Sequence, residues 1–486
     1  MKTLQDILFG VSIEATVGKT AIEVEGINFD SRLIQKGFVY VAQKGVLADG
    51  HDFIAPAISK GAIAIICETL TDQCDKDIVY VKVENSSKTL GIIASNFYDN
   101  PSKKLTLLGI TGTNGKTTIA SLLHALFSSE GYSSGLLSTV KISYASNQFE
   151  NLHTTPDAVA INQHLHAMVE EGVTHCFMEV SSHGIVQNRI EGLFFSGGVF
   201  TNLTHDHLDY HGDFKSYRDT KKRFFDFLPK TAFALTNVDD KNGAYMLQNT
   251  VAKKYSYATH QHADFKAQIL ECQFSGMLLK IQSQDVWTSL IGKFNAQNLI
   301  AVYAVASLLE IPSLSILKRI SELKSVNGRF QTLQASNKGT VVIDYAHTPD
   351  ALENVLTTLS TIRTRNESLI TIVGCGGNRD QEKRPLMAEV AVRYSDKVIF
   401  TSDNPRNEDP AVIISEMMKG VPPEHYKKTL KVTLREEAIA MAGQLAQEGD
   451  IVLIAGKGHE TYQEIKGEQF PFSDMEIAKQ IFLNAD

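Results

Sequence analysis

The sequence has few of the features that mark secreted, membrane-bound or nucleic-acid-binding proteins. Its 486 residues include only five cysteines, an odd number with no C-x-x-C pair. Four of the five lie in or beside strand-like apolar runs, which predicts buried, reduced thiols in a cytosolic protein. The N-terminal stretch MKTLQDILFGVSIEA carries an acid at Asp6 and no long apolar segment, so we expect no signal peptide. These absences predict a cytoplasmic location.

Long apolar runs and excess positive charge are also missing. No run approaches about 18 apolar residues, so membrane insertion is not expected. The chain has 47 basic and 55 acidic residues, a formal net charge of −8. This balance disfavours a nucleic-acid partner but allows a local basic pocket for an anionic ligand. We expect a monomer that acts on small molecules.

The length predicts about three domains, and the order of apolar runs predicts an α/β fold in each of them. Residues 1–103 are expected to form a small N-terminal α/β domain, and 104–331 a central P-loop domain with a parallel sheet. Residues 332–486 repeat the strand–helix alternation of a doubly wound, Rossmann-like sheet. Turn-rich stretches at 98–105 and 325–339 are expected to be linkers.

The most specific local motif is GITGTNGKTT, residues 109–118. A buried strand leads into a glycine-rich loop, and Lys116 and Thr117 open a helix whose N-terminus can cradle phosphates. Lys116 can neutralise phosphate charge, and the Thr117 hydroxyl can reach Mg²⁺. The loop is a variant, because Ile110 stands where the standard P-loop has glycine. A glycine-rich turn without a ligand is the alternative interpretation.

This loop resembles the ATP loop of the Mur ligases and folylpolyglutamate synthetases, which form amide bonds after activating a carboxylate as an acyl phosphate. Further motifs resemble Mur ligases in the family's order along all three units. They are FDSR (29–32), HTTPD (153–157), EVSSHGIVQNR (179–189), NLTHDHLDYHG (202–212), GKFNAQN (292–298), DYAHTPD (344–350), GCGGNRD (374–380), DNPR (403–406) and GKGHE (456–460). The chain is therefore identified as a member of the Mur ligase family.

The resemblance implies an ATP site formed by the central and C-terminal units. Thr348-Pro349-Asp350 also matches an ordinary helix start with proline at its first position, so some of these polar residues could be caps. The implied ATP-binding residues are Gly112, Thr113, Asn114, Gly115, Lys116, Thr117, Thr118, Asn295, Asn298, Asp344 and His347.

The resemblance also implies a Mg²⁺ site made by Thr117, Glu179, His207 and Lys221, with Lys221 converted by CO₂ into a carbamate. Lys116, Lys221 and His207 are the implied catalytic residues. From the residues alone, THDHLDYHG could indicate zinc, but its spacing is irregular and no cysteine is near. His205 and His211 are expected to be structural. The stretch 217–225 could also be an amphipathic helix with a solvated basic face, and the adjacent Lys222 is the alternative carbamate site.

Two substrate regions follow from the same resemblance. A UDP-sugar dipeptide is implied to contact Ser31, Thr154, Thr155, Ser181, Gln187 and Arg189. An amino acid is implied to contact Arg379, Asp403, Asn404, Pro405, Arg406, Gly456 and Glu460.

The stretch SDNPRNEDP could be a plain turn before a helix that begins near Pro410. The proline stiffens the corner and so pre-positions Arg406. The two candidate amino acids are diaminopimelate and lysine, and only diaminopimelate has a second carboxylate at its far end. A guanidinium binds a carboxylate with two parallel hydrogen bonds, so Arg406 suits diaminopimelate. Lysine would present an ammonium there instead.

The resemblance thus implies a ligase of peptidoglycan precursor synthesis that uses ATP and Mg²⁺. The γ-phosphate would pass to the D-glutamate γ-carboxylate of UDP-N-acetylmuramoyl-L-alanyl-D-glutamate, and the amine of meso-diaminopimelate would then displace phosphate. The same ligase using L-lysine is one alternative. A P-loop NTPase that switches a partner is another, although it has no evident use for Arg379, Asn404, Arg406 and Glu460.

Overall fold

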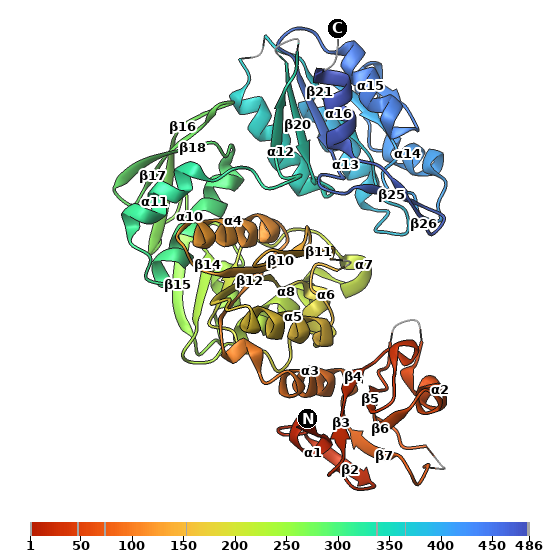
Figure 1. Cartoon of the computed structure of the whole chain (residues 1–486). Helices are drawn as coiled ribbons and strands as arrows, with labels where there is room; N and C mark the ends of the chain where they lie inside the picture. Colours follow the sequence, from red (N-terminus) through yellow and green to blue (C-terminus); the bar gives the residue numbers. More distant parts are fainter. Residues whose placement is uncertain are drawn as a thin grey trace.

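The computed structural model describes residues 2–45, 48–71, 74–151, 153–336, 339–364 and 366–483. Three sheets with flanking helices follow one another along the chain, and the central unit lies between the N-terminal and C-terminal units (Figure 1). The predicted α/β fold class is confirmed. The boundaries at 103/104 and 331/332 stay a prediction, and residues 337 and 338 of the expected linker lie outside the described residues.

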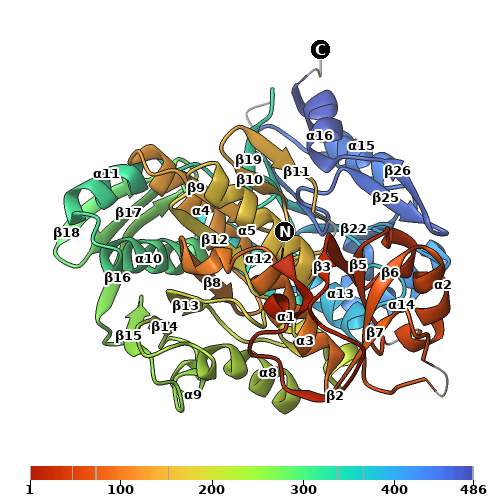
Figure 2. The same ribbon diagram turned by 60° about the horizontal axis from the view of Figure 1, so that its bottom comes forward.

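The N-terminal unit has a five-stranded sheet of order β2-β7-β6-β5-β4, parallel except for β2. Helix α3 packs against β4 and β5 (Figure 2). The unit contains β1 (Lys2–Thr3), α1 (Leu4–Ile7), β2 (Ile13–Val17), β3 (Glu23–Val24), β4 (Gly26–Asn28), the 3₁₀ helix η1 (Ser31–Leu33), β5 (Phe38–Val41), η2 (Gly50–Phe53), α2 (Ile54–Ser59), β6 (Ala62–Cys67), β7 (Val79–Val83), α3 (Ser86–Phe97) and η3 (Pro101–Lys103).

The central unit has an eleven-stranded sheet of order β11-β10-β9-β12-β8-β13-β14-β15-β16-β17-β18. The strands from β9 to β15 in this order are parallel, and four of them, β8, β12, β13 and β14, are the continuous apolar runs that predict buried strands. The unit contains β8 (Thr106–Thr111), α4 (Lys116–Ser129), β9 (Ser134–Leu137), β10 (Ile142–Tyr144), β11 (Asn147–Phe149), α5 (Ala158–Glu170), β12 (His175–Glu179), α6 (Ser182–Val186), β13 (Gly197–Phe200), α7 (Leu208–His211), α8 (Phe214–Asp226), β14 (Phe233–Asn237), α9 (Gly243–Met246), β15 (Lys253–Ala258), β16 (Phe265–Gln273), β17 (Gly276–Ile281), β18 (Gln284–Thr288), α10 (Lys293–Leu308) and α11 (Ser313–Glu322).

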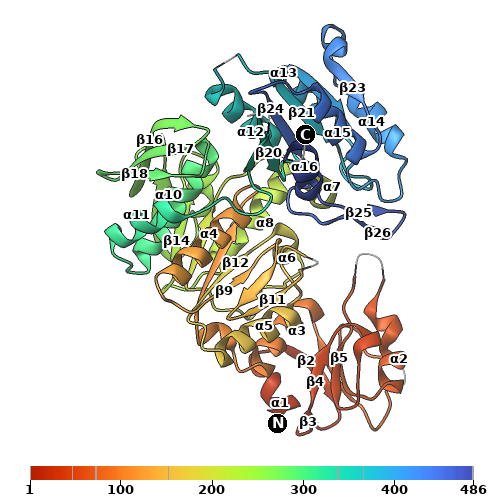
Figure 3. The same cartoon turned by 45° about the horizontal axis from the view of Figure 1, so that its top comes forward.

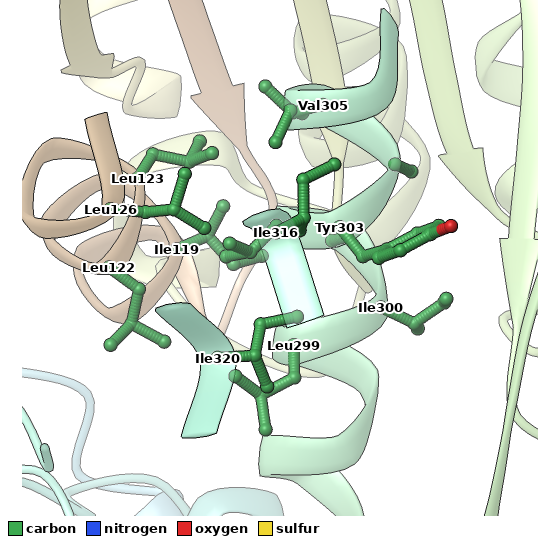
Figure 4. Packing of buried hydrophobic residues seen from close by; sticks show 14 of the residues in the cluster. Ile119, Leu122, Leu123, Leu126, Leu299, Ile300, Tyr303, Val305, Ile316 and Ile320 are labelled. Carbon is green, nitrogen blue, oxygen red and sulfur yellow. The ribbon is translucent and has the colours of Figure 1, made fainter. Parts of the chain in front are cut away.

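Helix α4 carries the phosphate loop at its N-terminus, and its apolar stripe anchors it. Ile119, Leu122, Leu123 and Leu126 recur at helical spacing and are fully or almost fully buried. Figure 4 shows them facing side chains of α10 and α11, including Leu299 and Ile316. This packing fixes the direction of the helix and so the position of the loop before it.

The C-terminal unit has a six-stranded sheet of order β19-β20-β24-β21-β22-β23 (Figure 3). Helices α12, α13 and α14 cover one face and α15 and α16 the other, so the sheet is doubly wound as predicted. The unit contains β19 (Gln331–Gln334), β20 (Thr340–Asp344), α12 (Pro349–Ile362), β21 (Leu369–Val373), α13 (Lys383–Tyr394), β22 (Lys397–Phe400), α14 (Pro410–Met418), η4 (Pro423–Lys428), β23 (Thr429–Lys431), α15 (Arg435–Leu445), β24 (Ile451–Ala455), β25 (Tyr462–Ile465), β26 (Glu468–Pro471) and α16 (Asp474–Leu483).

Two parts of these sheets were not expected from the sequence. The expected linker 325–339 contains β19, an antiparallel edge strand paired with β20. The antiparallel strands β16, β17 and β18 extend the central sheet. Exposed or half-buried residues interrupt each of these strands, so they lack the continuous apolar runs by which most of the parallel strands were recognised.

The parallel strands bring the motif loops to one edge of each sheet. In the central sheet, Glu179 at the end of β12 pairs in register with Ile110 of β8, just before the phosphate loop. In the C-terminal sheet, β20 ends at Asp344, and β21, β22 and β24 end before the loops that hold Arg379, Asp403 and Gly456. Ligands bind at such carboxyl edges.

Candidate active site

The phosphate loop is a tight cradle built on two glycines in the left-handed region. Gly112 has φ 147°, and a Cβ there would lie 1.8 Å from Thr201 Oγ1. Gly115 has φ 88° and precedes the first turn of α4. The Lys116 ammonium donates to the carbonyls of Gly112 at 2.9 Å and Thr113 at 2.8 Å. Burial lowers the pKa of Lys116, although Glu179 and Asp206 oppose the shift.

The loop after β13 holds the phosphate loop from the other side. Asn202 accepts the backbone N–H of Thr113 at 2.8 Å through its carbonyl and that of Asn114 at 2.9 Å through its side chain. The Thr201 hydroxyl donates to the Asn114 carbonyl at 2.6 Å. The Asn114 amide in turn donates to Asp350 of α12 at 3.0 Å, joining the loop to the C-terminal unit. Thr201 and Asn202 were not among the predicted site residues.

Glu179 is fully buried, and its partners are polar groups of the phosphate loop and the β9–β10 turn. The Thr117 hydroxyl donates to Glu179 Oε2 at 3.0 Å. Thr139 donates its backbone N–H to Oε1 at 2.7 Å and its hydroxyl to Oε2 at 3.2 Å. Two of the predicted Mg²⁺ ligands, Thr117 and Glu179, are therefore in direct contact. Thr139 is an addition that the sequence did not indicate.

His207 lies beside Asp206, with Nε2 3.4 Å from Asp206 Oδ2, and its φ is 55°. Burial lowers the pKa of His207 to about 3, so its imidazole is neutral and able to donate a lone pair. His211 bonds Ser182 at 2.9 Å, and His205 lies 3.5 Å from Asp380 of the C-terminal unit. Among the described residues, no group of three or more His, Cys, Asp and Glu side chains could hold a metal ion by itself.

The two lysines of α8 have different surroundings, and neither has the solvated position that an amphipathic pattern indicates. Lys221 is 1% exposed, and its Nζ donates to the Gly112 carbonyl at 2.8 Å. Burial, followed by the charge of Lys116, lowers the pKa of Lys221 well below its usual value. Lys222 instead forms an ion pair with Asp226 at 2.7 Å. The fold thus brings Lys221, and not Lys222, to the phosphate loop.

A cavity of about 420 Å³ opens between the central and C-terminal units at this edge. Asn295 does not line it, because its amide donates to the Ile291 carbonyl at 2.9 Å and its oxygen accepts from Asn298 at 3.3 Å. The predicted residues that line the cavity are Thr113, Asn114, Gly115, Lys116, Thr117, Thr118, Thr154, Glu179, His207, Asn298, Asp344 and His347.

Arg329 lines the same cavity but was missed, because its stretch was interpreted as a linker. Its Nη2 donates to Thr117 Oγ1 at 3.3 Å, and its guanidinium stacks 4.3 Å from the Tyr345 ring centroid. The next residue, Phe330, donates its N–H to Asp344 at 2.6 Å. Burial raises the pKa of Asp344 to about 6. The segment between the units therefore contributes directly to the site.

The residues expected to hold the UDP-sugar dipeptide fall into two places. Thr155 donates to the Glu179 carbonyl at 2.8 Å and accepts the Ser181 N–H at 2.9 Å. Arg189 donates to the Gln187 side chain at 3.0 Å and to the Thr155 carbonyl. Thr154 belongs to the same cluster, since its hydroxyl accepts from Thr139 at 3.1 Å. Ser31 lies apart on η1 of the N-terminal unit, and no contact among the described residues joins it to this cluster.

The corner at 403–406 meets the loop after β24. The Lys457 ammonium is fully buried and donates to Asn404 Oδ1 at 3.0 Å and Glu460 Oε2 at 2.8 Å. Asn404 donates its amide to the same Glu460 oxygen at 2.8 Å, and Asp403 lies 3.9 Å from the Lys457 ammonium. Burial, and next the Asp403 charge, raise the pKa of Glu460. Lys457 was not predicted, although it stands inside the GKGHE motif.

The cationic half of this corner consists of Arg406 and Arg379. Arg406 follows Pro405, and its Nε donates to Glu464 Oε2 at 3.0 Å. Arg379 is exposed and forms no hydrogen bond or ion pair with the described residues. Gly456 has φ 116°, and a Cβ there would lie 2.7 Å from Asp403 Oδ2, so glycine is required for this close approach.

Three family models match the chain in succession: the Mur ligase family catalytic domain over 23–98, the Mur ligase middle domain over 110–306 and the Mur ligase glutamate ligase domain over 328–458. A UDP-N-acetylmuramoyl-L-alanyl-D-glutamate--2,6-diaminopimelate ligase from Cytophaga hutchinsonii is 51% identical over 479 residues, 98% of each chain. The chain belongs to the Mur ligase family. The predicted family membership is confirmed.

Other Mur ligases agree with this assignment. The protein of the same name from Bacillus velezensis is 40% identical over 466 residues and 94% of each chain. A solved structure of a protein of that name has a TM-score of 0.69 at 32% identity and covers 99% of this chain and 98% of that one. MurF from Thermotoga maritima in complex with ADP, 19% identical with a TM-score of 0.62, covers 94% of this chain and 96% of that one and shows the shared fold. No helix of the described part of the chain is long and apolar enough to span a membrane.

The phosphate loop of this Mur ligase should not tolerate a side chain at Gly112. We expect Gly112→Ala to lower affinity for a non-hydrolysable ATP analogue at least about tenfold, because the new Cβ meets Thr201 Oγ1. Gly131→Ala is the matched control, since Gly131 also has positive φ but nothing lies within 4 Å of its Cβ. Calorimetric titration measures both variants. Wild-type affinity of Gly112→Ala for the ATP analogue would show that the loop does not need glycine at this position.

Proposed function

We propose that this chain is an ATP-dependent ligase that joins meso-diaminopimelate to the D-glutamate γ-carboxylate of UDP-N-acetylmuramoyl-L-alanyl-D-glutamate, with release of ADP and phosphate. Relatives bearing the name of this activity are 48–51% identical over nearly the whole chain. We assign binding of the UDP substrate to residues 1–103, of ATP to residues 104–331 and of the amino acid to residues 332–486.

The observation that carries the proposal is the charge pattern at the 403–406 corner. Among the described residues, Asp403 and Glu460 pair with Lys457, and the nearby buried Arg435 is paired with Asp474, which leaves an excess of acids for an ammonium. Arg406 pairs with Glu464, and Arg379 forms no ion pair with the described residues, which leaves net positive charge for a carboxylate. The distal end of diaminopimelate carries both groups. Lysine has only the ammonium and would leave the cationic half without a partner.

Lys116, the phosphate-loop amides and the helix N-terminus would hold the ATP phosphates. Arg329 and His347 extend this cationic and polar wall from the C-terminal side. Hard oxygen donors suit Mg²⁺, and nucleotide sites need few protein ligands, so the buried Thr117–Glu179 pair fits the ion with His207 as the third candidate. Bound there, Mg²⁺ would neutralise charge on the transferred phosphoryl group.

Lys221 is suited to carbamate formation because burial and the charge of Lys116 lower its pKa, which raises the fraction of the amine that is unprotonated. Its Nζ lone pair would attack CO₂, one C=O electron pair would move to oxygen, and one Nζ proton would leave to solvent. The product places an anion beside Lys116. This change would relieve the repulsion between the two amines and add oxygen donors to the site.

Catalysis by these residues is mainly positioning and charge neutralisation. As the γ-phosphorus bond to the bridging oxygen breaks, a bond to the substrate carboxylate oxygen forms, and Lys116 stabilises the phosphate charge. The amine nitrogen of diaminopimelate then attacks the acyl carbon, loses a proton and expels phosphate. Asn114 bonding to Asp350 keeps the two units together, which helps to exclude the water that would hydrolyse the acyl phosphate.

The protein is proposed to work in the cytoplasm as a monomer on small molecules alone, without nucleic-acid or membrane partners. Sedimentation velocity would test the monomer. The remaining alternatives are the same ligase with L-lysine and a P-loop NTPase that switches a partner.

A product assay separates these functions. We expect ADP release to require the UDP-sugar dipeptide and an amino acid together, with meso-diaminopimelate preferred to L-lysine. Mass spectrometry of the nucleotide product identifies the added residue. Turnover that is indifferent to both substrates would support an NTPase, and preference for lysine would refute the assignment of the corner.

Arg406 should decide this preference. We expect Arg406→Ala and Arg406→Lys to lower kcat/KM for diaminopimelate at least about thirtyfold, because a charge-assisted contact is lost, with ATP affinity unchanged. Arg393→Ala is the control, since Arg393 is a half-exposed arginine of the same unit that pairs only with surface acids. Near-normal ligation by either Arg406 variant would refute the role.

Ligase activity and the carbamate should depend on Lys221 and not on Lys222. We expect Lys221→Ala to lose at least about a hundredfold in kcat, with partial rescue by formate or acetate standing in for the carbamate. Wild-type protein in ¹³C-bicarbonate should show a carbamate carbon signal by NMR that Lys221→Ala lacks. Lys222→Ala, which removes only the Asp226 pair, should keep both the signal and the activity. A signal that persists in Lys221→Ala would contradict the assignment.

A further inference from the structure

The hairpin of β25 and β26 holds the 403–406 corner along most of its length. Gln463 donates its side-chain amide to the Asp403 carbonyl, and Glu464 donates its N–H to Asn404 Oδ1 at 2.9 Å. Arg406 donates its N–H to the Glu464 carbonyl at 3.0 Å and accepts the Lys466 N–H at 2.7 Å. The corner therefore depends on a segment about 60 residues further along the chain.

Arg406 needs this support because its backbone is strained. Its φ is 51°, in the left-handed region that residues other than glycine rarely adopt. Such a conformation persists only where the surroundings over-determine it. The two backbone hydrogen bonds to the hairpin and the preceding Pro405 supply that constraint, and they fix the direction in which the arginine side chain leaves the backbone.

The guanidinium is then oriented by two further contacts. Nε donates to Glu464 Oε2 at 3.0 Å, and Nη1 donates to the Gly377 carbonyl at 2.9 Å. Nη2 has no hydrogen-bond partner within the described part of the chain. These two contacts fix the plane of the group, and Nη1 and Nη2 still have N–H groups that can face a carboxylate. Both side chains are partly accessible, at 22% for Arg406 and 30% for Glu464, so a small ligand can reach the pair.

We propose that Glu464 is a positioning residue for amino-acid specificity: its carboxylate holds Nε of Arg406 so that the free end of the guanidinium meets the distal carboxylate of the incoming amino acid. This inference rests on the proposed function. The hairpin contributes no residue to the site predicted from the sequence. With Glu464 in this role, the hairpin determines whether an amino acid with a second carboxylate is selected.

The same contact allows an opposite role. Glu464 could be an internal carboxylate that occupies Arg406 and competes with the substrate. Removal of Glu464 would then lower KM for diaminopimelate. If Glu464 positions Arg406, its removal raises that KM instead, because the guanidinium regains rotational freedom.

Three substitutions of Glu464 separate the effect of its side-chain length from the effect of its charge. Glu464→Gln keeps an oxygen acceptor at the same distance without the charge, and Glu464→Asp keeps the charge but shortens the side chain by one methylene. Positioning predicts that Glu464→Ala and Glu464→Asp raise KM for diaminopimelate about tenfold with kcat little changed, whereas Glu464→Gln stays within about threefold of wild type. The KM values for ATP and the UDP-sugar dipeptide should not change. A near-wild-type KM in Glu464→Asp together with a tenfold higher KM in Glu464→Gln would refute positioning. That result would show that the charge of residue 464 matters and the length of its side chain does not.

The matched control is Glu468→Ala, since Glu468 is an exposed acid on the same hairpin, opposite Ile465. It should leave every constant unchanged. In an Arg406→Ala background, Glu464→Ala should add no further loss, because a positioning residue has nothing left to position. Additive losses in that double variant would indicate a separate role and overturn the inference.

The two proposals fail in different ways. If the wild-type protein does not ligate diaminopimelate, the proposed function is wrong before Glu464 is tested. If it does, and Arg406→Ala raises KM while Glu464→Ala leaves it unchanged or lowers it, only the role of Glu464 is wrong.

Discussion

The site depends on two buried amines that share one carbonyl oxygen. Lys116 and Lys221 both donate to the Gly112 carbonyl, which places their nitrogens no more than about 6 Å apart in a medium where like charges repel strongly. Burial lowers the pKa of both amines, and the charge of Lys116 lowers that of Lys221 further. Glu179 and Asp206 offset part of this repulsion, and further anions would offset the rest. An ATP phosphate against Lys116 and a carbamate on Lys221 would supply them, so charge balance links nucleotide binding, metal binding and lysine chemistry.

The proposed reacting groups and the groups proposed to select the amino acid are carried by different units. The phosphate loop, Glu179 and Lys221 belong to the central sheet, whereas the 403–406 corner and the hairpin that supports it belong to the C-terminal unit. Arg329 and the Asn114–Asp350 hydrogen bond connect the two. In the proposed reaction, the amine held by the C-terminal unit attacks the carboxylate activated by the central unit. The two groups of residues must therefore lie close together. Their position at the carboxyl edges of the two sheets makes this meeting possible.

Much of the fold could be predicted because the parallel strands are buried on both faces and read as continuous apolar runs. The doubly wound C-terminal sheet, the phosphate loop and the helix that begins at Pro349 with Thr348 as its cap follow from such local patterns. The strands β16 to β18 and β19 were missed because one-sided burial leaves a weak pattern. Arg329, Lys457 and Glu464 were missed for another reason. They are ordinary charged residues in sequence, and most of the partners that give them roles lie far away along the chain.

The sequence alone determined the residue types and the short-range geometry of the site: glycines where the phosphate loop needs positive φ, a lysine and threonine at a helix start, and a proline that stiffens the corner before Arg406. Tertiary structure decided which of these residues act together. It turned Lys221 toward Gly112 and Lys222 toward Asp226, and placed Asn295 behind Asn298 instead of in the cavity. It also gave Arg406 a carboxylate partner 58 residues away. Protonation and orientation depend on burial and on distant neighbours, and a local pattern contains neither.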